Sequence, residues 1–497
     1  MNLPFSADNL AALRQELADR PRQLFIGGAF VDAADGDSFD VVDPATGQVF
    51  AQAARGGAED IDRAVTAARG AFDRWAATPP AQRARLMLRL ADLIEAHGER
   101  IALTETLDNG MPFMMAKFAG VAAAAEQLRY NAGWATKITG ETMQVSWPGE
   151  WQAMSLREPV GVVGAIVPWN FPFVMAVAKI APAIAAGCTV VLKPAEQTPL
   201  TAAILGELVA AADFPPGVIN VVTGFGKTAG AALVEHDGVD KVSFTGSTVT
   251  GKSIVRAAMG NLKRVTLELG GKSPTIVFAD ADLEKAIPSA AMGIFGNAGQ
   301  VCAAGSRLFV HASIYDRVVE AIAERARTLR IGAGLTPGTE MGPLVSQQQL
   351  DRVLGYIESG MNEGAGVNVG GQRVEGEGYF VQPTVLTGTV AGMKVTDEEI
   401  FGPVLCAMRF DDEDVDGIAA QANATEYGLS SAIWTRDISK AFRLAKRIKA
   451  GTVRINGGAG VDPAMPLGGF KQSGWGRENG RGGVEAYTEL KAITIGL

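Results

Sequence analysis

Residues 160–193 read VGVVGAIVPWNFPFVMAVAKIAPAIAAGCTVVLK, and this stretch decides the fold class of the chain. It is the longest apolar stretch of the sequence, so a membrane-spanning helix has to be considered first. Asn170, Pro172, Lys179 and Pro182 are among the residues that interrupt it. Because proline and glycine end regular elements, the stretch divides into a predicted strand at 160–167 and a predicted helix at 173–186. The sequence therefore predicts a strand–helix unit and not a membrane span.

The same alternation of strand and helix continues after this unit. Short apolar runs predict further strands at 188–192, 218–222, 239–244, 264–269 and 275–278. Helix-forming segments lie between them at 200–212, 228–235 and 252–259. Such alternation predicts an α/β fold with a parallel sheet covered on both faces, whose ligands bind at the carboxyl ends of the strands. A second α/β series follows, with strands expected at 308–311, 404–410, 429–434 and 452–455 and helices at 315–329 and 438–448.

The composition excludes several classes of protein. The 497 residues carry 45 Lys and Arg against 54 Asp and Glu, a net charge of −9, which is not the basic footprint of a nucleic-acid-binding or anionic-membrane protein. The three cysteines form no CxxC pair and the three histidines have no ligand spacing, so we expect neither a disulfide framework nor a metal site. The N-terminus lacks a secretion signal, and we expect a cytoplasmic protein.

Cys302 is a candidate nucleophile. It lies in GNAGQVCAAGSR (residues 296–307), among small residues that let a substrate approach, and nearby backbone amides would favour its thiolate. The alternative is a free cysteine that packs as a small buried hydrophobe. That alternative is our prediction for Cys188 and Cys406, which lie in apolar strands.

Two polar residues follow predicted strand ends, where the substrates of parallel sheets bind. Glu268 ends the strand RVTLELGG, and its carboxylate is a candidate base; it would otherwise be exposed or ion-paired. Asn170 in VPWNFP would donate its amide to a developing oxyanion or cap the next helix. Position alone does not separate these possibilities.

Three loops together predict a nucleotide site opposite the thiol. In FTGSTVTGK, Ser247 is a predicted helix N-cap beside free amides that attract phosphate. The TGFGKTAG loop holds Gly224, Gly226 and Gly230 but is not a true GxGxxG motif. In KPAEQTP, Lys193 and Glu196 would either recognise a ribose or form an exposed ion pair.

Seven motifs, in the same order and spacing, make the chain resemble the NAD(P)-dependent aldehyde dehydrogenases over almost its whole length. They are VPWNFP, KPAEQTPLT, FTGST, VTLELGGKSP, GQVCAAGSR, EEIFGPV and PLGGFKQSGWGREN. The local sequence is also similar to the phenylacetaldehyde and betaine aldehyde dehydrogenase branches. A Rossmann-like coenzyme domain, an α/β catalytic domain and a small β oligomerisation extension are what the resemblance implies for the fold.

The resemblance implies a thioester mechanism. Cys302 would attack the aldehyde, Asn170 and the Cys302 amide would hold the oxyanion, and Glu268 would activate the hydrolytic water. Lys179 and Glu478 match a proton relay found in some members, or would form a structural ion pair. The presence of Glu268 argues against the CoA-acylating branch of the family.

The resemblance also implies the cofactor and its contacts. Glu196 would accept bonds from both ribose hydroxyls and repel a 2′-phosphate, so NAD is expected, with NADP possible as a secondary cofactor. The residues expected around the cofactor are Ile166, Trp169, Lys193, Glu196, Gly226, Gly246, Ser247, Glu399 and Phe401.

The substrate tunnel is expected to be roomy, because several positions that are often aromatic in the family carry small residues here. The expected tunnel residues are Phe171, Met175, Ala178, Gly296, Val301, Val461 and Leu467. We predict a bulky hydrophobic or aromatic aldehyde, unless Phe173, Met175 or Met465 refill the space. The alternatives are a betaine or small aliphatic aldehyde and, outside this class, a Cys302–His311 thiol hydrolase or a catalytically inactive structural protein.

The family organisation gives the expected domains. Residues 1–135 and 158–268 would form the NAD-binding domain and residues 269–469 the catalytic domain. Residues 136–157 and 481–497 would form the oligomerisation extension of a homotetramer or dimer. The C-terminal strand shows no partner of its own in the sequence, so we expect it to pair with the sheet of a neighbouring subunit.

Overall fold

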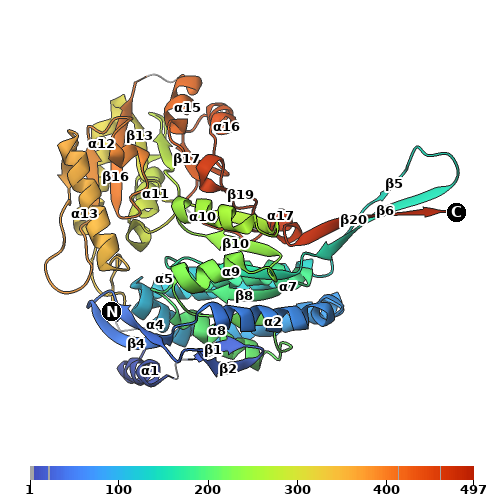
Figure 1. Ribbon diagram of the computed structural model, residues 1–497. Helices are drawn as coiled ribbons and strands as arrows, with labels where there is room; N and C mark the ends of the chain where they lie inside the picture. Colours follow the sequence, from blue (N-terminus) through green and yellow to red (C-terminus); the bar gives the residue numbers. More distant parts are fainter. Residues whose placement is uncertain (1–4, 21–22, 412–413, 459) are drawn as a thin grey trace.

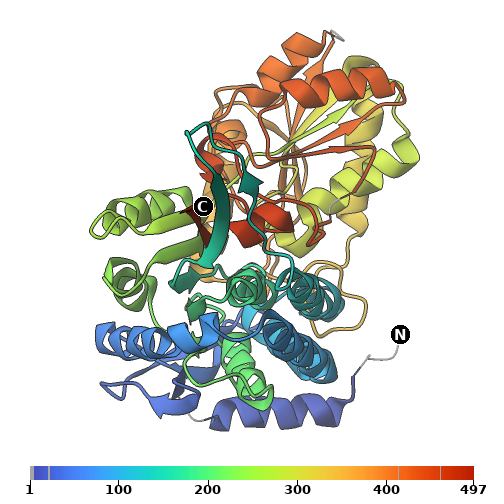
Figure 2. The ribbon, with the colours of Figure 1, turned by 90° about the vertical axis from the view of Figure 1, so that its right-hand side faces the viewer.

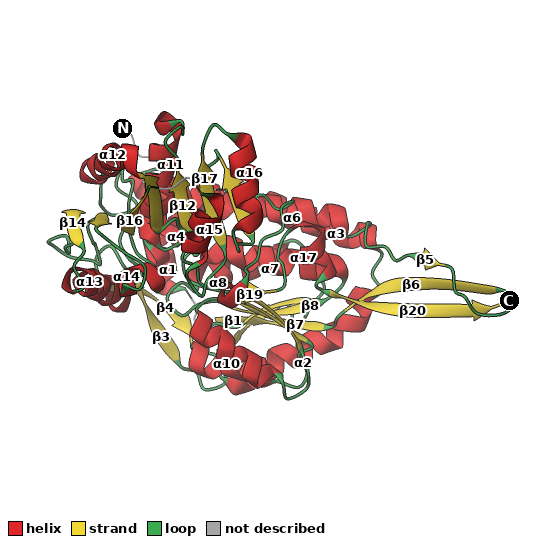
Figure 3. Ribbon diagram, turned by 90° about the horizontal axis from the view of Figure 1, so that it is seen from above, coloured by secondary structure: helices red, strands yellow, loops and turns green. Residues whose placement is uncertain are grey.

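The computed structural model describes residues 5–20, 23–411, 414–458 and 460–497. It consists of two α/β bodies and a long β arm that projects away from them (Figures 1 and 3). No helix among the described residues combines the length and the apolar character that a membrane crossing needs.

The first body is built on a mostly parallel sheet. Eight strands of the described chain form it, in the order β19-β11-β10-β7-β8-β9-β1-β2. Its parallel centre comprises β7 (Val162–Ile166), β8 (Thr189–Lys193), β9 (Ile219–Val221), β10 (Lys241–Thr245) and β11 (Arg264–Glu268). The antiparallel edges are β1 (Gln23–Ile26), β2 (Ala29–Asp32) and β19 (Gly474–Trp475).

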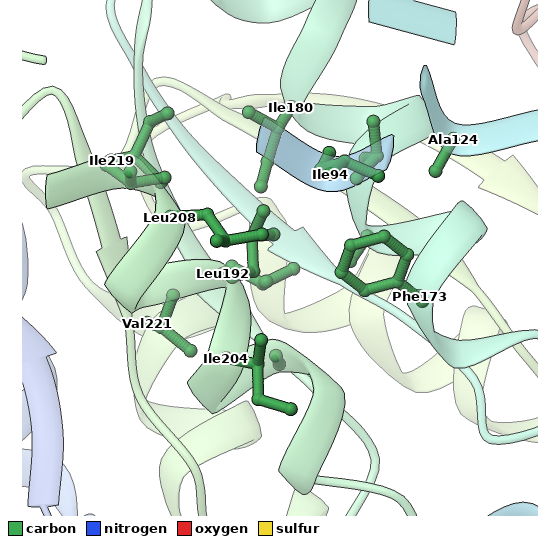
Figure 4. Packing of buried hydrophobic residues seen from close by; sticks show 14 of the residues in the cluster. Ile94, Ala124, Phe173, Ile180, Leu192, Ile204, Leu208, Ile219 and Val221 are labelled. Carbon is green, nitrogen blue, oxygen red and sulfur yellow. The ribbon is translucent and has the colours of Figure 1, made fainter. Parts of the chain in front are cut away.

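Both faces of this sheet are buried, as the near-continuous apolar strands predict. Along β7, Val163 and Ala165 pack into one hydrophobic cluster, whereas Val162 and Ile166 pack into another on the opposite face. The first face is covered by α3 (Pro80–Ala96), α4 (Gly98–Asn109), α6 (Ala123–Trp134), α7 (Pro172–Ala186) and α8 (Leu200–Ala211). Figure 4 shows Leu192 of β8 among the side chains of α7 and α8. The second face is covered by α2 (Ala58–Ala76), α9 (Ala231–Glu235) and α10 (Thr248–Ala258).

The remaining elements of the first body include two departures from regular α-helix and strand. A π-helix over Ala116–Ala122 joins α5 (Phe113–Met115) to α6, and a second one over Gly226–Gly230 precedes α9. The helix expected at 228–235 is therefore a π-turn followed by a short α-helix. An N-terminal helix, α1 (Ala7–Asp19), and the hairpin of β3 (Ser38–Asp43) and β4 (Gln48–Ala54) complete this body.

The second body repeats the sandwich with another sheet. Seven strands of the described chain form it, in the order β14-β15-β16-β13-β12-β17-β18, and all pairs except β14·β15 are parallel. The strands are β12 (Pro274–Val277), β13 (Arg307–His311), β14 (Gly366–Val369), β15 (Thr384–Thr387), β16 (Val404–Phe410), β17 (Ser430–Trp434) and β18 (Thr452–Ile455). One face carries α11 (Leu283–Phe295), α12 (Tyr315–Thr328), α13 (Gln347–Asn362) and α14 (Lys394–Asp397). The other carries α15 (Val415–Asn423) and α16 (Ile438–Arg447).

The C-terminal strand has a partner within its own chain. β20 (Thr488–Gly496) pairs in antiparallel register along the whole of β6 (Trp151–Pro159), and β5 (Thr142–Met143) adds a short third strand. The expectation of a partnerless tail was wrong, because β6 lies more than three hundred residues earlier and no local pattern links the two. Before β20, the tail forms α17 (Gly480–Glu485), and the arm extends to one side of the molecule (Figure 1), so that it points toward the viewer in Figure 2.

Close backbone contact fixes the point where the chain returns from the second body to the first. Gly474 of β19 lies opposite Glu268 of β11, and its φ of 120° is unfavourable for a side chain. A Cβ atom at Gly474 would overlap the Leu267 carbonyl oxygen. Only glycine therefore lets β19 pair with the strand that carries Glu268.

Gly474→Ala should destabilise the protein because it creates both the overlap and the backbone strain. We expect the free energy of unfolding to fall by about 2–4 kcal/mol, measured by urea unfolding. The matched control is Gly355→Ala in α13, where a Cβ atom meets nothing within 4 Å. There, the better helix propensity of alanine should raise the stability by about 1 kcal/mol. Equal effects of the two substitutions would contradict the role assigned to Gly474.

Candidate active site

Cys302 lies in a loop between the two bodies, after α11 and before β13. The residues before it have left-handed backbone conformations: Asn297 (φ 49°), Ala298 (φ 52°) and Gly299 (φ 71°). Such strain in non-glycine residues persists only where the surrounding structure imposes it, and it is concentrated at functional sites. The loop is held by close contact on two sides, because a Cβ atom at Gly299 would overlap the Gly402 carbonyl and one at Gly271 would overlap the Cys302 carbonyl oxygen.

The protonation state of Cys302 differs from the sequence prediction. The pKa of its thiol is raised to about 12, first by burial and then by the nearby carboxyl groups of Glu399 and Glu268. The backbone amides of Ala303 and Cys302 lower the pKa, as expected, but they are outweighed. Cys302 is therefore a thiol at neutral pH, and the prediction of a favoured thiolate was wrong for this state of the protein. The sequence does not show that the fold brings the carboxyl groups of Glu399 and Glu268 beside Cys302.

Glu268, at the end of β11, is a buried and almost unsolvated carboxyl group. Its Oε1 atom has no hydrogen-bond partner among the described residues. The pKa of Glu268 is raised well above its usual value, mainly by burial and then by Glu478, while Lys179 and Arg477 oppose the shift. The alternative of an exposed Glu268 is excluded by its 5% exposure. A carboxyl group with an unpaired oxygen and a raised pKa is suited to taking up a proton.

Lys179 and Glu478 form a buried ion pair behind Glu268. The Lys179 ammonium group donates to Glu478 Oε1 and, at 3.2 Å, to Ser243 Oγ. The hydroxyl of Ser243 donates to Glu478 Oε1 at 3.3 Å and accepts from Tyr487 at 3.3 Å. The roles of Ser243 and Tyr487 were not predicted, because neither a serine in an apolar strand nor a tyrosine in the turn before β20 carries a local signal of a shared network.

Asn170 follows β7 and reaches the Cys302 loop. Its Nδ2 atom donates to the Gln300 carbonyl oxygen at 2.8 Å, and the side chain is buried. The helix-cap alternative is not what the structure has, because the N-cap residue of α7 is Phe171. One N–H of the amide group remains for another acceptor.

The predicted cofactor residues line the carboxyl edge of the first sheet. Lys193, at the end of β8, is buried and donates to Glu196 Oε2 at 3.2 Å, whereas the Glu196 side chain is 34% exposed. Ser247 caps α10 by accepting from Thr250 N at 3.2 Å. Gly246 differs from the others, since its amide already donates to the Glu268 carbonyl at 3.0 Å and is not free for phosphate.

The opposite side of this edge is provided by the second body. Glu399 Oε1 accepts from Gly271 N at 2.9 Å, and burial raises the pKa of Glu399 to about 7. Phe401 has a left-handed φ of 62° and packs edge-on against Trp169, with ring centroids 5.2 Å apart. Ile166 is buried in the core beneath them.

These residues fit a dinucleotide. Apart from the adjoining backbone, no atom of the described residues lies within 4 Å of the position that a Cβ atom would occupy on Gly226, so the backbone there is open to a ligand. The Lys193–Glu196 pair offers a donor and an acceptor for ribose hydroxyls, and the N-terminus of α10 offers backbone amides for phosphate.

The predicted tunnel residues are only partly brought together. Gly296 ends α11, and a Cβ atom on it would lie 3.3 Å from Met292 Sδ and 3.9 Å from the Met115 methyl group. These two methionines, which sequence reasoning missed, border the space left at Gly296, and Met292 is itself 59% exposed. The signal for Met292 was its place four residues before Gly296 on the same helix. Phe171, Met175, Ala178, Val301 and Leu467 are partly buried, whereas Val461 is exposed.

The residues expected to refill the tunnel do not all do so. Phe173 is fully buried in the hydrophobic core of the first body and takes no part. Met465 is 59% exposed.

The remaining cysteines and His311 lie outside this site. Cys188 and Cys406 are fully buried, which confirms the prediction that they pack in the core. The His311 ring contacts Ser313 Oγ at 2.8 Å and packs edge-on against Phe410, and neither contact involves Cys302.

The site matches a known family. The model of the aldehyde dehydrogenase family matches residues 30–493. The chain belongs to the aldehyde dehydrogenase family. DhaS of Bacillus subtilis is 50% identical over 478 residues, which are 96% of each chain, and the phenylacetaldehyde dehydrogenase of Pseudomonas fluorescens is 47% identical over 483 residues, again 96% of each. The NAD+ complex of the Bacillus cereus aldehyde dehydrogenase superposes with a TM-score of 0.96 at 47% identity and covers 100% of both chains.

The raised thiol pKa predicts how this aldehyde dehydrogenase reacts with an alkylating agent. Because the thiolate is the reactive form, iodoacetamide should label Cys302 slowly at pH 7 and about tenfold faster with each pH unit up to pH 10. Mass spectrometry of the cofactor-free protein measures the rate, and Cys302→Ala should stay unlabelled because the other cysteines are buried. A rate that levels off near pH 8 would show that the thiol pKa is not raised.

Proposed function

We propose that this protein oxidises a bulky hydrophobic or aromatic aldehyde to its carboxylic acid, with NAD, through a thioester on Cys302. The observation that carries the proposal is the convergence of Asn170 and Glu268, from two strand ends of the first body, on the Cys302 loop of the second. A nucleophile, an oxyanion donor and a base are the three groups that acyl transfer needs.

Cys302 performs the first step. Its sulfur forms a bond to the aldehyde carbon, and the thiol proton passes to Glu268, whose unpaired Oε1 is the nearby acceptor. The carbonyl oxygen becomes an oxyanion that accepts from the second N–H of Asn170 and from the Cys302 backbone amide. Conversion of this adduct to the thioester requires loss of a hydride from the same carbon, and bound NAD would supply the hydride acceptor.

Glu268 performs the second step. It takes a proton from a water molecule that attacks the thioester; the C–S bond breaks, and Cys302 regains its proton as the acid leaves. The proposed route by which the proton leaves Glu268 is the Lys179–Glu478 ion pair. The Ser243 hydroxyl is hydrogen-bonded to both members of this pair. The raised pKa of Glu268, caused mainly by burial, favours its protonated form and makes it a stronger base.

NAD is the proposed cofactor, with NADP as a secondary one. The Bacillus cereus relative has an NAD+ complex, and the Lys193–Glu196 pair would bind the adenosine ribose. Glu399 and Phe401 would hold the nicotinamide end, with Trp169 and Ile166 beside it. Gly226 and Ser247 would face the pyrophosphate, with Gly246 contributing space and not a hydrogen bond.

The methionine-lined wall at Gly296 supports a bulky substrate. Thioether side chains are flexible and can move aside for a large apolar group, which a phenyl ring at position 296 could not. The relative from Pseudomonas fluorescens is named for an aromatic aldehyde. A betaine or small aliphatic aldehyde is the second candidate substrate. The thiol hydrolase has little support, since His311 contacts Ser313 and Phe410.

A cytoplasmic homotetramer or dimer is the proposed assembly. The arm of β5, β6 and β20 exposes large apolar side chains, among them Trp147, Trp151, Leu156, Leu490 and Ile495. A neighbouring subunit that covered them would remove this surface from water. Residues 136–157, which include most of β6, together with residues 481–497 form this proposed extension, and the NAD-binding and catalytic domains are proposed with the bounds given above.

Gly296→Phe tests the substrate class. With NAD and aldehydes graded from acetaldehyde to large aryl compounds, we expect NADH formation by the unmodified enzyme to increase with the bulk of the aldehyde. Gly296→Phe should lower kcat/KM for the largest aldehyde by about tenfold or more and leave kcat/KM for acetaldehyde nearly unchanged. The phenyl ring would take up the space beside position 296 that only a large aldehyde needs. Gly293→Ala, one turn earlier and open around its Cβ position, should change neither.

Cys302→Ala should form no NADH with any aldehyde. Activity confined to small aldehydes would contradict the bulky substrate but keep the mechanism. Activity that remained in Cys302→Ala would contradict the mechanism itself.

Glu196→Ser tests the cofactor preference. Removing the carboxylate removes its repulsion of a 2′-phosphate, while Lys193 loses its ion-pair partner and can meet the phosphate. We expect kcat/KM for NADP to rise by about tenfold and that for NAD to fall, measured by steady-state kinetics at one fixed aldehyde concentration. An unchanged NAD/NADP ratio would exclude Glu196 from the ribose site.

A further inference from the structure

Asn170 is held in a closed ring of three hydrogen bonds. Its Nδ2 atom donates to the backbone carbonyl oxygen of Gln300 at 2.8 Å. The backbone N–H of Gln300 donates in turn to the backbone carbonyl oxygen of Asn297 at 3.0 Å. The ring closes when Asn297 Nδ2 donates to the Asn170 carbonyl oxygen at 2.9 Å. It joins the segment after β7 in the first body to the loop that ends in Cys302.

The segment of Asn170 is anchored on its other side by α4. Asn109, the last residue of that helix, donates from Nδ2 to the Trp169 carbonyl oxygen at 2.7 Å and accepts from Met111 N at 3.1 Å. Two successive carbonyl groups, those of Trp169 and Asn170, are thus each bonded to an asparagine side chain from a different element.

The four carboxamides are out of reach of bulk water. Asn109 and Gln300 are fully buried, and Asn170 and Asn297 are 3% and 2% exposed. A hydrogen bond lost here leaves a buried polar group unpaired, because water does not replace it readily. Asparagine also tolerates the left-handed backbone at position 297 better than most residues, so that residue type meets two needs at once.

The ring decides how the amide of Asn170 is turned. The Gln300 carbonyl can only accept, so the nitrogen and not the oxygen of Asn170 faces it. Because the carboxamide group is planar, the hydrogen bond of one N–H to the Gln300 carbonyl also fixes the direction of the second N–H. If Asn170 rotated, its oxygen atom would face the developing negative charge.

We propose that Asn297 and Asn109 are positioning residues that set the orientation of the oxyanion donor Asn170 relative to Cys302. The inference rests on the proposed function, in which Asn170 stabilises the oxyanion. Asn297 acts across the seam between the two bodies, and Asn109 fixes the same segment from within the first body. Neither touches the substrate; both act through Asn170.

Asn297→Gly tests the proposal, because glycine keeps the left-handed backbone and removes only the donor. We expect kcat for the oxidation of an aldehyde to fall by about ten- to a hundredfold, since a small misplacement of an oxyanion donor costs that much, with little change in KM. The rate of Cys302 alkylation should stay the same, because the thiol environment is not changed. A merely structural loss would alter both.

The double variant shows whether Asn297 acts through Asn170. In an Asn170→Ala background, adding Asn297→Gly should lower kcat by less than about twofold, because residues that act as a unit are not additive. A full ten- to hundredfold loss in that background, or no loss from Asn297→Gly alone, would overturn the proposal. Full activity of Asn170→Ala would overturn the oxyanion role itself, and with it both proposals.

Asn456→Gly is the matched control. Asn456 has a φ of 51° and donates from Nδ2 to the Thr435 carbonyl oxygen at 2.8 Å, so the same backbone and the same kind of bond are changed outside the ring. Because Asn456 is exposed, Asn456→Gly should lower the thermal midpoint less than Asn297→Gly does, and it should leave kcat within about twofold. If Asn297→Gly does not fold, Asn109→Leu removes the other anchor without altering the Cys302 loop, and the same non-additivity with Asn170→Ala is expected.

Discussion

The active site depends on the close approach of two backbones at the seam between the α/β bodies. A Cβ atom at Gly271, just after β11, would overlap the carbonyl oxygen of Cys302, and one at Gly299 would overlap the carbonyl of Gly402. Because no side chain fits between these segments, the loop of the nucleophile lies directly against the strand end that carries Glu268. The hydrogen bonds, raised pKa values and cofactor edge described above all depend on this contact.

The same contact removes water from the ionisable groups, and this determines their resting charge. Burial is the largest cause of the raised pKa values of Cys302, Glu268 and Glu399, and the carboxyl groups of Glu399 and Glu268 raise the pKa of Cys302 further. A site that brought a thiolate and two carboxylates together in a dry seam would carry uncompensated negative charge. The raised pKa values reduce this charge, because each one favours the protonated form of its group. The proposed reaction then requires that protons leave Glu268 through neighbouring polar groups, and the ion pair of Lys179 and Glu478 is the proposed route.

Much of the fold and part of the site could be predicted from the sequence, and the division has a physical basis. The α/β class, the strands around β7 and the placement of Glu268 and Asn170 at strand ends follow from local apolar patterning and from the rule that parallel sheets bind ligands at one edge. The partnership of β6 and β20 could not be predicted, since pairing between distant segments leaves no local pattern. The thiol pKa was predicted in the wrong direction, because only the folded chain brings Glu399 and Glu268 beside Cys302.

The helix α4 links the π-helix over Ala116–Ala122 to the segment that carries Asn170. At one point on this helix, Glu105 accepts from Phe173 N at 3.3 Å, near the start of α7, and its other oxygen atom has no partner among the described residues. At this same carboxyl group, a Cβ atom on Gly120 of the π-helix would overlap Oε2, so the π-helix packs directly on Glu105. Burial raises the pKa of Glu105 to about 8, so it is a neutral group at pH 7 and holds both elements without a buried charge. One helix therefore contacts the π-helix, the start of α7 and, through Asn109, the segment of Asn170, so direct packing and buried hydrogen bonds, and not solvent-exposed side chains, hold these three segments together.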